Sequence, residues 1–188
     1  MDETEKDLLA RCLAGDSSAF GSVVDAYQDR IYSFALRLLK DPVAAEEAAQ
    51  EAFVKAFRAI NSYKPAQPFA PWLFRIAHNA CMDALRGGGR TVSMDHEDFP
   101  DLPDGAPGVD EAVGDSIDSA NIEALLGSLP PIYSEALLLQ YREDMGPADI
   151  ARITGVPEGT VKARLFRGRE LIKAKLRTGD ATVSGGRP

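Results

Sequence analysis

Hydrophobic residues recur every three or four positions along most of the chain, which is the spacing of one face of an α-helix. The longest run, residues 19–40, has apolar positions at Phe20, Val23, Val24, Tyr27, Ile31, Phe34, Ala35 and Leu38. A short helix is expected before it, over residues 7–14. Asp41 and Pro42 then give an N-cap followed by proline, which predicts another helix to about residue 60. We therefore expect an all-α protein.

Two further helical stripes complete the first half of the chain. The helix from residue 42 is expected to bury Ala49, Phe53, Phe57 and Ile60. A loop with three prolines follows at residues 61–71, and a helix then runs from Pro71 or Trp72 to Arg86. Its buried stripe is expected to contain Leu73, Ile76, Ala77, Ala80 and Ala84.

The pattern stops after Gly87, Gly88 and Gly89. Residues 90–120 contain nine Asp or Glu and one Arg, a net charge of −8 that equals the charge of the whole chain. Such a run of acids and prolines does not bury enough apolar surface to fold. We therefore predict two small helical bundles, residues 1–88 and 119–177, joined by a flexible acidic linker, residues 89–118, with a disordered tail over residues 178–188.

The second bundle contains two helices joined by a tight corner. Pro147 suits the first turn of one helix, Gly155 suits its left-handed end, and Pro157 opens the next. Helices over residues 120–127 and from Pro130 or Pro131 to before Arg142 are expected to close a core over them. The last helix has an apolar stripe at Val161, Leu165, Gly168, Ile172 and Leu176. This arrangement is a helix-turn-helix, whose second helix can enter a DNA major groove.

Charge supports that interpretation. Residues 157–177 contain seven Lys or Arg and two Glu, a net +5 within an acidic protein. The alternative is a solvated amphipathic helix. The coincidence of corner, apolar stripe and basic charge favours binding to DNA phosphates.

The first bundle offers two polar faces. Its third helix has Glu46, Glu47, Gln50 and Glu51 in the first half, which fits either helix stabilisation by the dipole or docking of a basic partner. The next helix aligns Trp72 with Arg75, Asn79, Asp83 and Arg86. This face could contact an opened nucleic-acid strand, although Trp72 alone also fits a core position.

Other functions find no support in the residues. There is no nucleophile–base pair, no phosphate-binding Gly loop and no Cys or His at metal spacing, so we expect neither an enzyme nor a metal or cofactor. Cys12 and Cys81 are expected to be reduced thiols. We see no apolar run that would span or insert into a membrane and no export signal, which predicts a cytoplasmic location.

Five segments in order resemble the extracytoplasmic-function (ECF, group 4) sigma factors of bacterial RNA polymerase. They are residues 20–27, 41–57 (DPVAAEEAAQEAFVKAF), 68–86 (PFAPWLFRIAHNACMDALR), 129–144 (LPPIYSEALLLQYRED) and 148–172 (ADIARITGVPEGTVKARLFRGRELI). The resemblance implies a promoter-specificity subunit with a region 2 domain, a linker and a region 4 domain. It also implies an anti-sigma factor as a partner.

The resemblance assigns roles to three residue sets. A face that docks on the clamp helices of the polymerase core would comprise Glu46, Glu47, Gln50 and Glu51. A surface for the −10 element, with a loop that receives a flipped base, would comprise Ser62, Tyr63, Lys64, Phe69, Trp72, Arg75, Asn79 and Arg86. A surface for the duplex −35 element, with Arg suited to guanine, would comprise Glu158, Thr160, Lys162, Ala163, Arg164 and Arg167.

The chain departs from the family pattern at several positions. Gly87–Gly89 replace a basic cluster, and Ala163 replaces a common serine. Two rival functions stay open on the residues alone. One is a one-component regulator that binds a palindromic operator as a dimer. The other is a protein-interaction adaptor that uses the acidic helix and has no DNA role.

Overall fold

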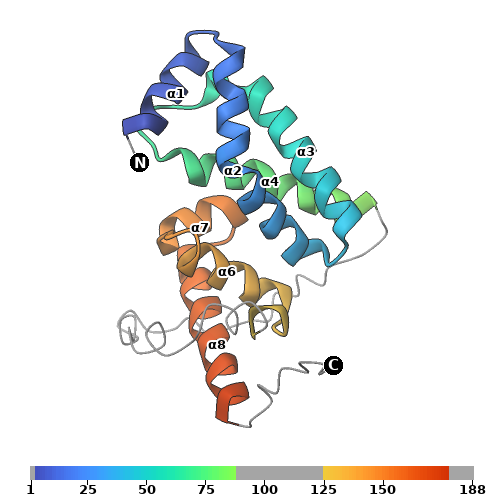
Figure 1. The fold of residues 1–188 in the computed structure, drawn as a ribbon. Coiled ribbons are helices and arrows are strands. Elements are labelled where there is room, and N and C mark those ends of the chain that lie inside the picture. Colours follow the sequence, from blue (N-terminus) through green and yellow to red (C-terminus); the bar gives the residue numbers. More distant parts are fainter. Residues whose placement is uncertain (1–2, 88–124, 178–188) are drawn as a thin grey trace, which may run out of the picture. The chain divides into compact units, whose positions relative to one another are not determined.

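The computed structural model describes residues 3–87 and 125–177 of the 188-residue chain (Figure 1). These residues form helices and contain no strand. They divide into two compact units, which are described separately below. The expected acidic linker, the expected tail and the first part of the expected helix at residues 120–127 lie outside the described residues.

The first unit is built from α1 (Glu3–Leu13), α2 (Ser17–Leu39), α3 (Pro42–Ala59), a 3-10 turn, η1 (Ile60–Ser62), and α4 (Phe69–Gly87). Two aspartates begin its central helices. The carboxylate of Asp16 accepts hydrogen bonds from the N–H groups of Ser18 and Ala19 at 3.0 and 3.4 Å. The carboxylate of Asp41 likewise accepts from the N–H groups of Val43 and Ala44 at the start of α3. Each cap satisfies N–H groups that have no partner within the helix.

Small residues let α3 pack closely against both α2 and α4 in the first unit. Its buried face is mostly alanine, at Ala45, Ala48, Ala49, Ala52 and Ala56, and it includes the ring of Phe53. Larger side chains from the neighbouring helices fill the remaining space. Phe34 of α2 meets Phe74 of α4 edge to face, with ring centroids 5.3 Å apart. Such ring pairs add to the apolar burial that stabilises the unit.

Several expectations for this unit were wrong in detail. The first helix spans Glu3–Leu13 rather than residues 7–14, and Ile76, expected on the buried stripe of α4, is half-buried. Phe57 is 46% exposed rather than buried, and its ring meets the edge of Phe20 at 5.2 Å. Alanines already occupy the centre of the α3 interface, so Phe57 lies at its margin. In α4, Ala84 is exposed and Leu85 is buried instead. That helix begins at Phe69, because Pro71 is tolerated within a first turn.

The second unit contains α6 (Pro131–Tyr141), α7 (Pro147–Thr154) and α8 (Glu158–Arg177). Every residue of α6 from Tyr133 to Leu139 is buried. It packs against α8, where Gly168 permits a close approach. A Cβ atom on Gly168 would lie only 2.7 Å from Cδ1 of Leu137. The stripe expected on α8 is buried as far as Ile172, whereas Leu176 is 41% exposed.

Candidate nucleic-acid interface

The exposed face of α3 combines carboxylates with apolar side chains. Its polar members Glu46, Glu47, Gln50 and Glu51 are all exposed. Val43, Val54 and Phe57 lie on the same side of the helix and are 67%, 48% and 46% exposed. At 100° per residue, Val43, Glu47 and Val54 fall within about 40° of one another around the helix. The face opposite the alanines is therefore suited to a partner with both basic and apolar groups.

An ion-pair chain joins this face to the end of α4. The ammonium group of Lys55 lies 3.0 Å from the carboxylate of Glu51 and 3.2 Å from that of Asp83. Asp83 also accepts a hydrogen bond from Arg86 at 2.5 Å. The hydrogen bond from Arg86, then that from Lys55, lowers the pKa of Asp83. Glu51 and Arg86, both singled out from the sequence, therefore already have partners within the first unit.

The proline-rich loop between η1 and α4 is supported by an aromatic cluster. The rings of Tyr63, Phe69 and Trp72 lie with centroids 5.3 to 5.6 Å apart. The Tyr63 hydroxyl donates to the carbonyl oxygen of Gln67 at 2.7 Å. Tyr63 and Phe69 are buried, with 4% and 1% exposure, whereas Trp72 is half-buried. These three packed side chains support the conformation of the loop.

The polar positions expected around this loop face solvent. Ser62 and Lys64 are exposed at its start, and the Ser62 hydroxyl donates to the carbonyl oxygen of Ala59 at 2.6 Å. Arg75, Asn79 and Arg86 are exposed on one face of α4. Stacking and phosphate contact both need accessible groups of these kinds. The structure thus brings an exposed amide and two guanidinium groups to the face that begins at Trp72.

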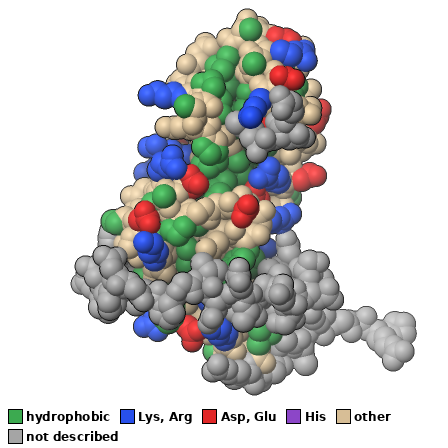
Figure 2. Space-filling view, turned by 90° about the vertical axis from the view of Figure 1, so that its left-hand side faces the viewer, with side chains coloured by type: hydrophobic (Ala, Val, Ile, Leu, Met, Phe, Trp, Pro, Cys, Tyr) green, Lys and Arg blue, Asp and Glu red, His purple; other side chains and the backbone are tan. Residues whose placement is uncertain are grey.

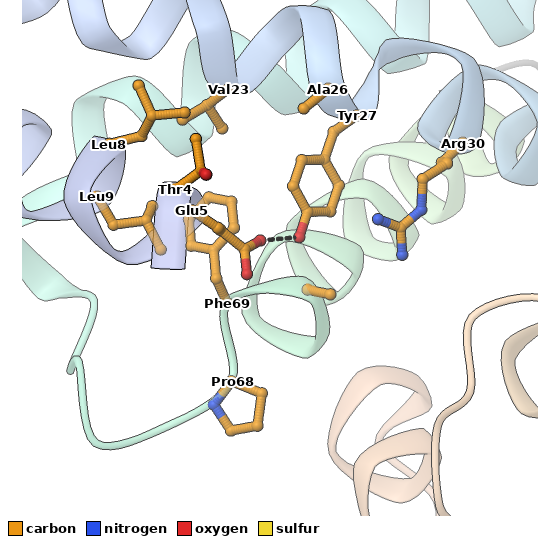
Figure 3. Close-up of a pocket in the computed structure, with 11 residues that line it drawn as sticks. Thr4, Glu5, Leu8, Leu9, Val23, Ala26, Tyr27, Arg30, Pro68 and Phe69 are labelled. Atoms are coloured by element: carbon orange, nitrogen blue, oxygen red, sulfur yellow. Dashed lines mark hydrogen bonds between the residues drawn. The ribbon is translucent and has the colours of Figure 1, made fainter. Parts of the chain in front are cut away.

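Sequence reasoning missed a cavity of about 490 Å³ between α1, α2 and the start of α4 (Figure 3). The hydroxyl of Tyr27 donates to Glu5 in this cavity, and the Arg30 guanidinium lies 4.6 Å from the centre of the Tyr27 ring. Burial, followed by the bond to Glu5, raises the pKa of Tyr27. Pro68, from the loop before α4, also lines this cavity. The only sign of this cavity in the sequence was the hydroxyl of Tyr27, a polar group on the otherwise apolar stripe of α2.

The corner between α7 and α8 follows the expected geometry. Gly155 has a φ of 74°, a left-handed conformation that glycine adopts without strain. The N–H of Val161 donates to the carbonyl oxygen of Pro157 at 3.1 Å as α8 begins. Glu158 and Lys162 are exposed and form an ion pair of 3.0 Å. Figure 2 shows Lys and Arg side chains interspersed with Asp and Glu side chains among the described residues that are visible in this view.

The residues expected to read DNA from α8 divide into two groups. Glu158, Lys162 and Arg167 are exposed and Thr160 is half-buried, so these side chains are accessible. Ala163 and Arg164 are buried, with 5% and 7% exposure. Burial lowers the pKa of Arg164, an effect that the charges of Glu135 and Tyr133 oppose.

The described residues contain no group of three or more His, Cys, Asp or Glu that could hold a metal ion. The expectations that the protein binds no metal and no cofactor stay predictions. Cys12 and Cys81 are buried free thiols. None of the described helices has the length and apolar character needed to cross a membrane.

Family models and individual proteins match this chain. Residues 23–91 match the model "Sigma-70 region 2", and residues 119–172 match "Sigma-70, region 4". The chain is 33% identical to the Bacillus subtilis "ECF RNA polymerase sigma factor SigW", over 94% of this chain and 99% of that protein. It is 32% identical to the Pseudomonas aeruginosa "RNA polymerase sigma-H factor", over 93% and 94% of the two chains.

Two solved structures share the fold. CnrH, solved in complex with the cytosolic domain of CnrY, superposes with a TM-score of 0.64 at 23% identity, covering 94% of this chain and 99% of that one. The sigma factor RpoE of Bartonella quintana, solved in complex with the anti-sigma factor NepR, superposes with a TM-score of 0.62 at 25% identity. That match covers 84% of this chain and 96% of the other.

Proposed function

Because the chain belongs to the ECF sigma factors of RNA polymerase, we propose that its two units bind separate parts of one transcription initiation complex. The first unit would dock on the core polymerase and hold the opened −10 element. The second unit would bind the duplex −35 element. We place their boundaries at residues 1–88 and 119–177.

The observation that carries this proposal is the exposed face of α3. Val43, Glu47, Gln50 and Val54 point away from the alanines that anchor the helix, so the face is available without unfolding the unit. Apolar side chains flanked by carboxylates suit a helical partner that presents basic and apolar groups. We assign Glu46, Glu47, Gln50 and Glu51 to the clamp helices of the polymerase, with Val43 and Val54 as apolar contacts.

The −10 surface would consist of the loop and the exposed face of α4. Lys64, Arg75 and Arg86 supply positive charge for phosphates, and Ser62 and Asn79 supply hydrogen-bonding groups. Trp72, half-buried beside the loop, is placed to stack on an unpaired base. The buried rings of Tyr63 and Phe69 would hold the loop in shape instead of contacting DNA. Releasing a base from the duplex costs a few kcal/mol, so this preformed support matters.

The −35 surface would be the exposed side of α8. Lys162 and Arg167 can reach phosphates or guanine edges in the major groove, while Glu158 and Thr160 begin the helix that enters it. The ion pair between Glu158 and Lys162 is exposed and contributes little to stability, so DNA can replace it. We leave Ala163 and Arg164 out of this surface because both are buried.

Other partners and properties follow from the same assignment. One solved relative, the sigma factor RpoE in complex with the anti-sigma factor NepR, supports such a partner here. We propose that the protein acts in the cytoplasm, where the polymerase works, and that it contributes binding energy rather than catalysis. A dimeric operator-binding regulator is not favoured, because both sigma-70 regions occur in this chain.

Charge reversal on α3 tests the docking face. Glu47→Arg should weaken binding of the full chain to purified bacterial core polymerase at least roughly tenfold, equivalent to about 1.4 kcal/mol. Asp29→Arg is the matched control, because Asp29 is an exposed carboxylate on α2, outside the proposed surface. Equal affinities of the two variants and the wild type would contradict the assignment of α3.

A further inference from the structure

We propose that Glu5, on the first helix, positions the loop that holds the opened −10 strand, and that it does so through its hydrogen bond to Tyr27. The loop comprises residues 63–68, between η1 and α4, and is called the −10 loop below. This inference rests on the proposed function, because it concerns how the first unit presents its −10 surface. Glu5 lies outside residues 23–91, which match the sigma-70 region 2 model, so that match assigns it no role.

The −10 loop rests on a group of packed rings that reaches back to α2. Phe69, which follows the loop, packs edge to face on Tyr27 with ring centroids 5.6 Å apart. Tyr63, which begins the loop, packs on the same Phe69 ring at 5.3 Å. Trp72 contacts both Tyr63 and Phe69. The position of the Tyr27 ring therefore affects both ends of the loop and Trp72.

Packing alone does not fix the Tyr27 ring, because a cavity of about 490 Å³ borders it. The same cavity borders Phe69 and Pro68, the last residue of the −10 loop (Figure 3). Side chains that border such a space lack packing partners on that side, so the two rings have room to shift. Core side chains are normally held by close contacts all around them. Here a polar bond supplies the orientation that packing leaves open.

The hydrogen bond between Tyr27 and Glu5 is that bond. The Tyr27 hydroxyl donates to the Glu5 carboxylate, which α1 brings to the cavity although the two residues are 22 positions apart. Tyr27 is 5% exposed, and a buried hydroxyl is nearly always hydrogen-bonded. A bond to an ionised group is about twice as strong as one between neutral groups. Glu5 therefore holds the ring in one orientation.

Glu5 also lies close enough to the −10 loop to influence it electrostatically. Burial, followed by the charge of Glu5, raises the pKa of Tyr63. The Tyr63 hydroxyl donates to the carbonyl oxygen of Gln67 at 2.7 Å within the loop. The Arg30 guanidinium lies over the face of the Tyr27 ring, 4.6 Å from its centre, which leaves the hydroxyl to Glu5. One carboxylate on α1 thus acts on both tyrosines that support the loop.

The test uses the full chain bound to core polymerase and a promoter that the wild-type holoenzyme selects from a library randomised in both elements. Affinities are measured with forked DNA, in which the −10 element is single-stranded. The −10 ratio compares the selected −10 sequence with a scrambled one, and the −35 ratio does the same for the −35 element. Tyr27→Phe and Glu5→Ala should each lower the −10 ratio at least about fivefold, the scale of a lost hydrogen bond, and leave the −35 ratio within about twofold of wild type.

Two further variants separate the hydrogen bond from general damage to the fold. Glu5→Gln keeps an oxygen that can accept from Tyr27, so its −10 ratio should stay within about twofold of wild type. The double variant Glu5→Ala/Tyr27→Phe should be no weaker than either single variant, because both substitutions remove the same bond. Acrylamide quenching of Trp72, measured on the full chain without DNA, should rise in Tyr27→Phe and in Glu5→Ala because the packed rings loosen.

Matched controls come from the same two helices. Tyr32→Phe removes a hydroxyl from α2, and Asp7→Ala removes an exposed carboxylate from α1. At 100° per residue, Tyr32 lies about 140° around α2 from Tyr27, and Asp7 lies about 160° around α1 from Glu5. Both controls should keep the wild-type −10 ratio and the wild-type quenching of Trp72. Hydrogen exchange of the α2 and α4 amides shows whether each variant keeps the first unit folded.

Four results would overturn the inference. One is a −10 ratio, or a quenching of Trp72, that Tyr27→Phe leaves unchanged. The second is an equal fall in the −10 and −35 ratios, which would indicate general damage. The third is a double variant whose loss is the product of the single losses, or Glu5→Gln as weak as Glu5→Ala. The fourth is loss of protected α2 and α4 amides in Tyr27→Phe, because the bond would then be needed for folding. A wild-type holoenzyme with no −10 preference would contradict the proposed function itself.

Discussion

The contact between α6 and α8 predicts the outcome of Gly168→Ala. The added Cβ would lie 2.7 Å from Cδ1 and 3.1 Å from Cγ of Leu137. Real Cβ atoms essentially never approach so closely, and Leu137 is fully buried with 0% exposure. It cannot rotate away without displacing its neighbours. Inserting a methyl group into such a site costs about 1–3 kcal/mol.

Helix propensity acts in the opposite direction. Alanine is favoured over glycine by about 0.8–1.0 kcal/mol within a helix. Because both Cδ1 and Cγ of Leu137 are too close, we take the upper part of the overpacking range. The net expectation is a loss of about 1–2 kcal/mol in the free energy of unfolding of the second unit.

Amide hydrogen exchange of the full chain in increasing urea measures this change locally, through the amides of α6 and α8. Gly159→Ala on the same helix is the control. A Cβ on Gly159 would have no neighbour within 4 Å, so that variant should be as stable as the wild type or more stable. A Gly168→Ala variant with undiminished protection would refute the close packing of α8 on α6.

Three further predictions concern the first unit, whose unfolding is reported by Trp72, the single tryptophan of the chain. Lys40 ends α2 in a left-handed conformation with φ 53°, which costs an L-residue about 1–2 kcal/mol. After the entropy cost of glycine is subtracted, Lys40→Gly should stabilise the unit by about 0.5–1 kcal/mol. A variant that unfolds at a lower urea concentration than the wild type would contradict this. The hydrogen bond from Ser18, followed by that from Arg11, lowers the pKa of Asp16 from 3.8 to about 2. The ionised Asp16 carboxylate therefore stabilises the folded unit fully above the unfolded-state pKa of 3.8, and this stabilisation is lost as the pH falls through the folded-state pKa of about 2. Acid unfolding of Asp16→Asn should therefore differ from wild type above pH 4, with the difference narrowing toward pH 2. Asp83→Asn removes the shared partner of Lys55 and Arg86. Because all three side chains are at least 39% exposed, the variant should lose no more than about 1 kcal/mol of stability, and this loss should shrink in 1 M salt. A loss of stability that does not depend on salt would show that another interaction is involved.

The helices could be predicted from the sequence because their signals are local. Asp41-Pro42, Gly155 and Pro157 mark helix ends through their own backbone preferences. The observed bounds of α3, Pro42–Ala59, and of α7, Pro147–Thr154, agree with those signals. The all-α class and the family resemblance are confirmed.

Details that depend on packing could not be read in the same way. Periodicity placed Phe57 on a buried stripe, but the alanines of α3 take the central contact and leave Phe57 at the margin. The same limit applies to Arg164. The sequence shows a basic residue on a helix that could bind DNA, and only the packing of the second unit shows that this residue is buried, with 7% exposure. Likewise, Glu5 and Tyr27 are 22 positions apart, and their hydrogen bond depends on how α1 packs on α2.

The central claim is that this chain directs RNA polymerase to promoters through both of its units. The most direct measurement maps transcript start sites from a promoter library, using purified bacterial core polymerase with and without the full chain. We predict a set of start sites that appears only with the chain, shares −10 and −35 sequences, and is used less with Glu47→Arg at a limiting concentration of the chain. Identical start sites in the presence and absence of the chain would contradict the account.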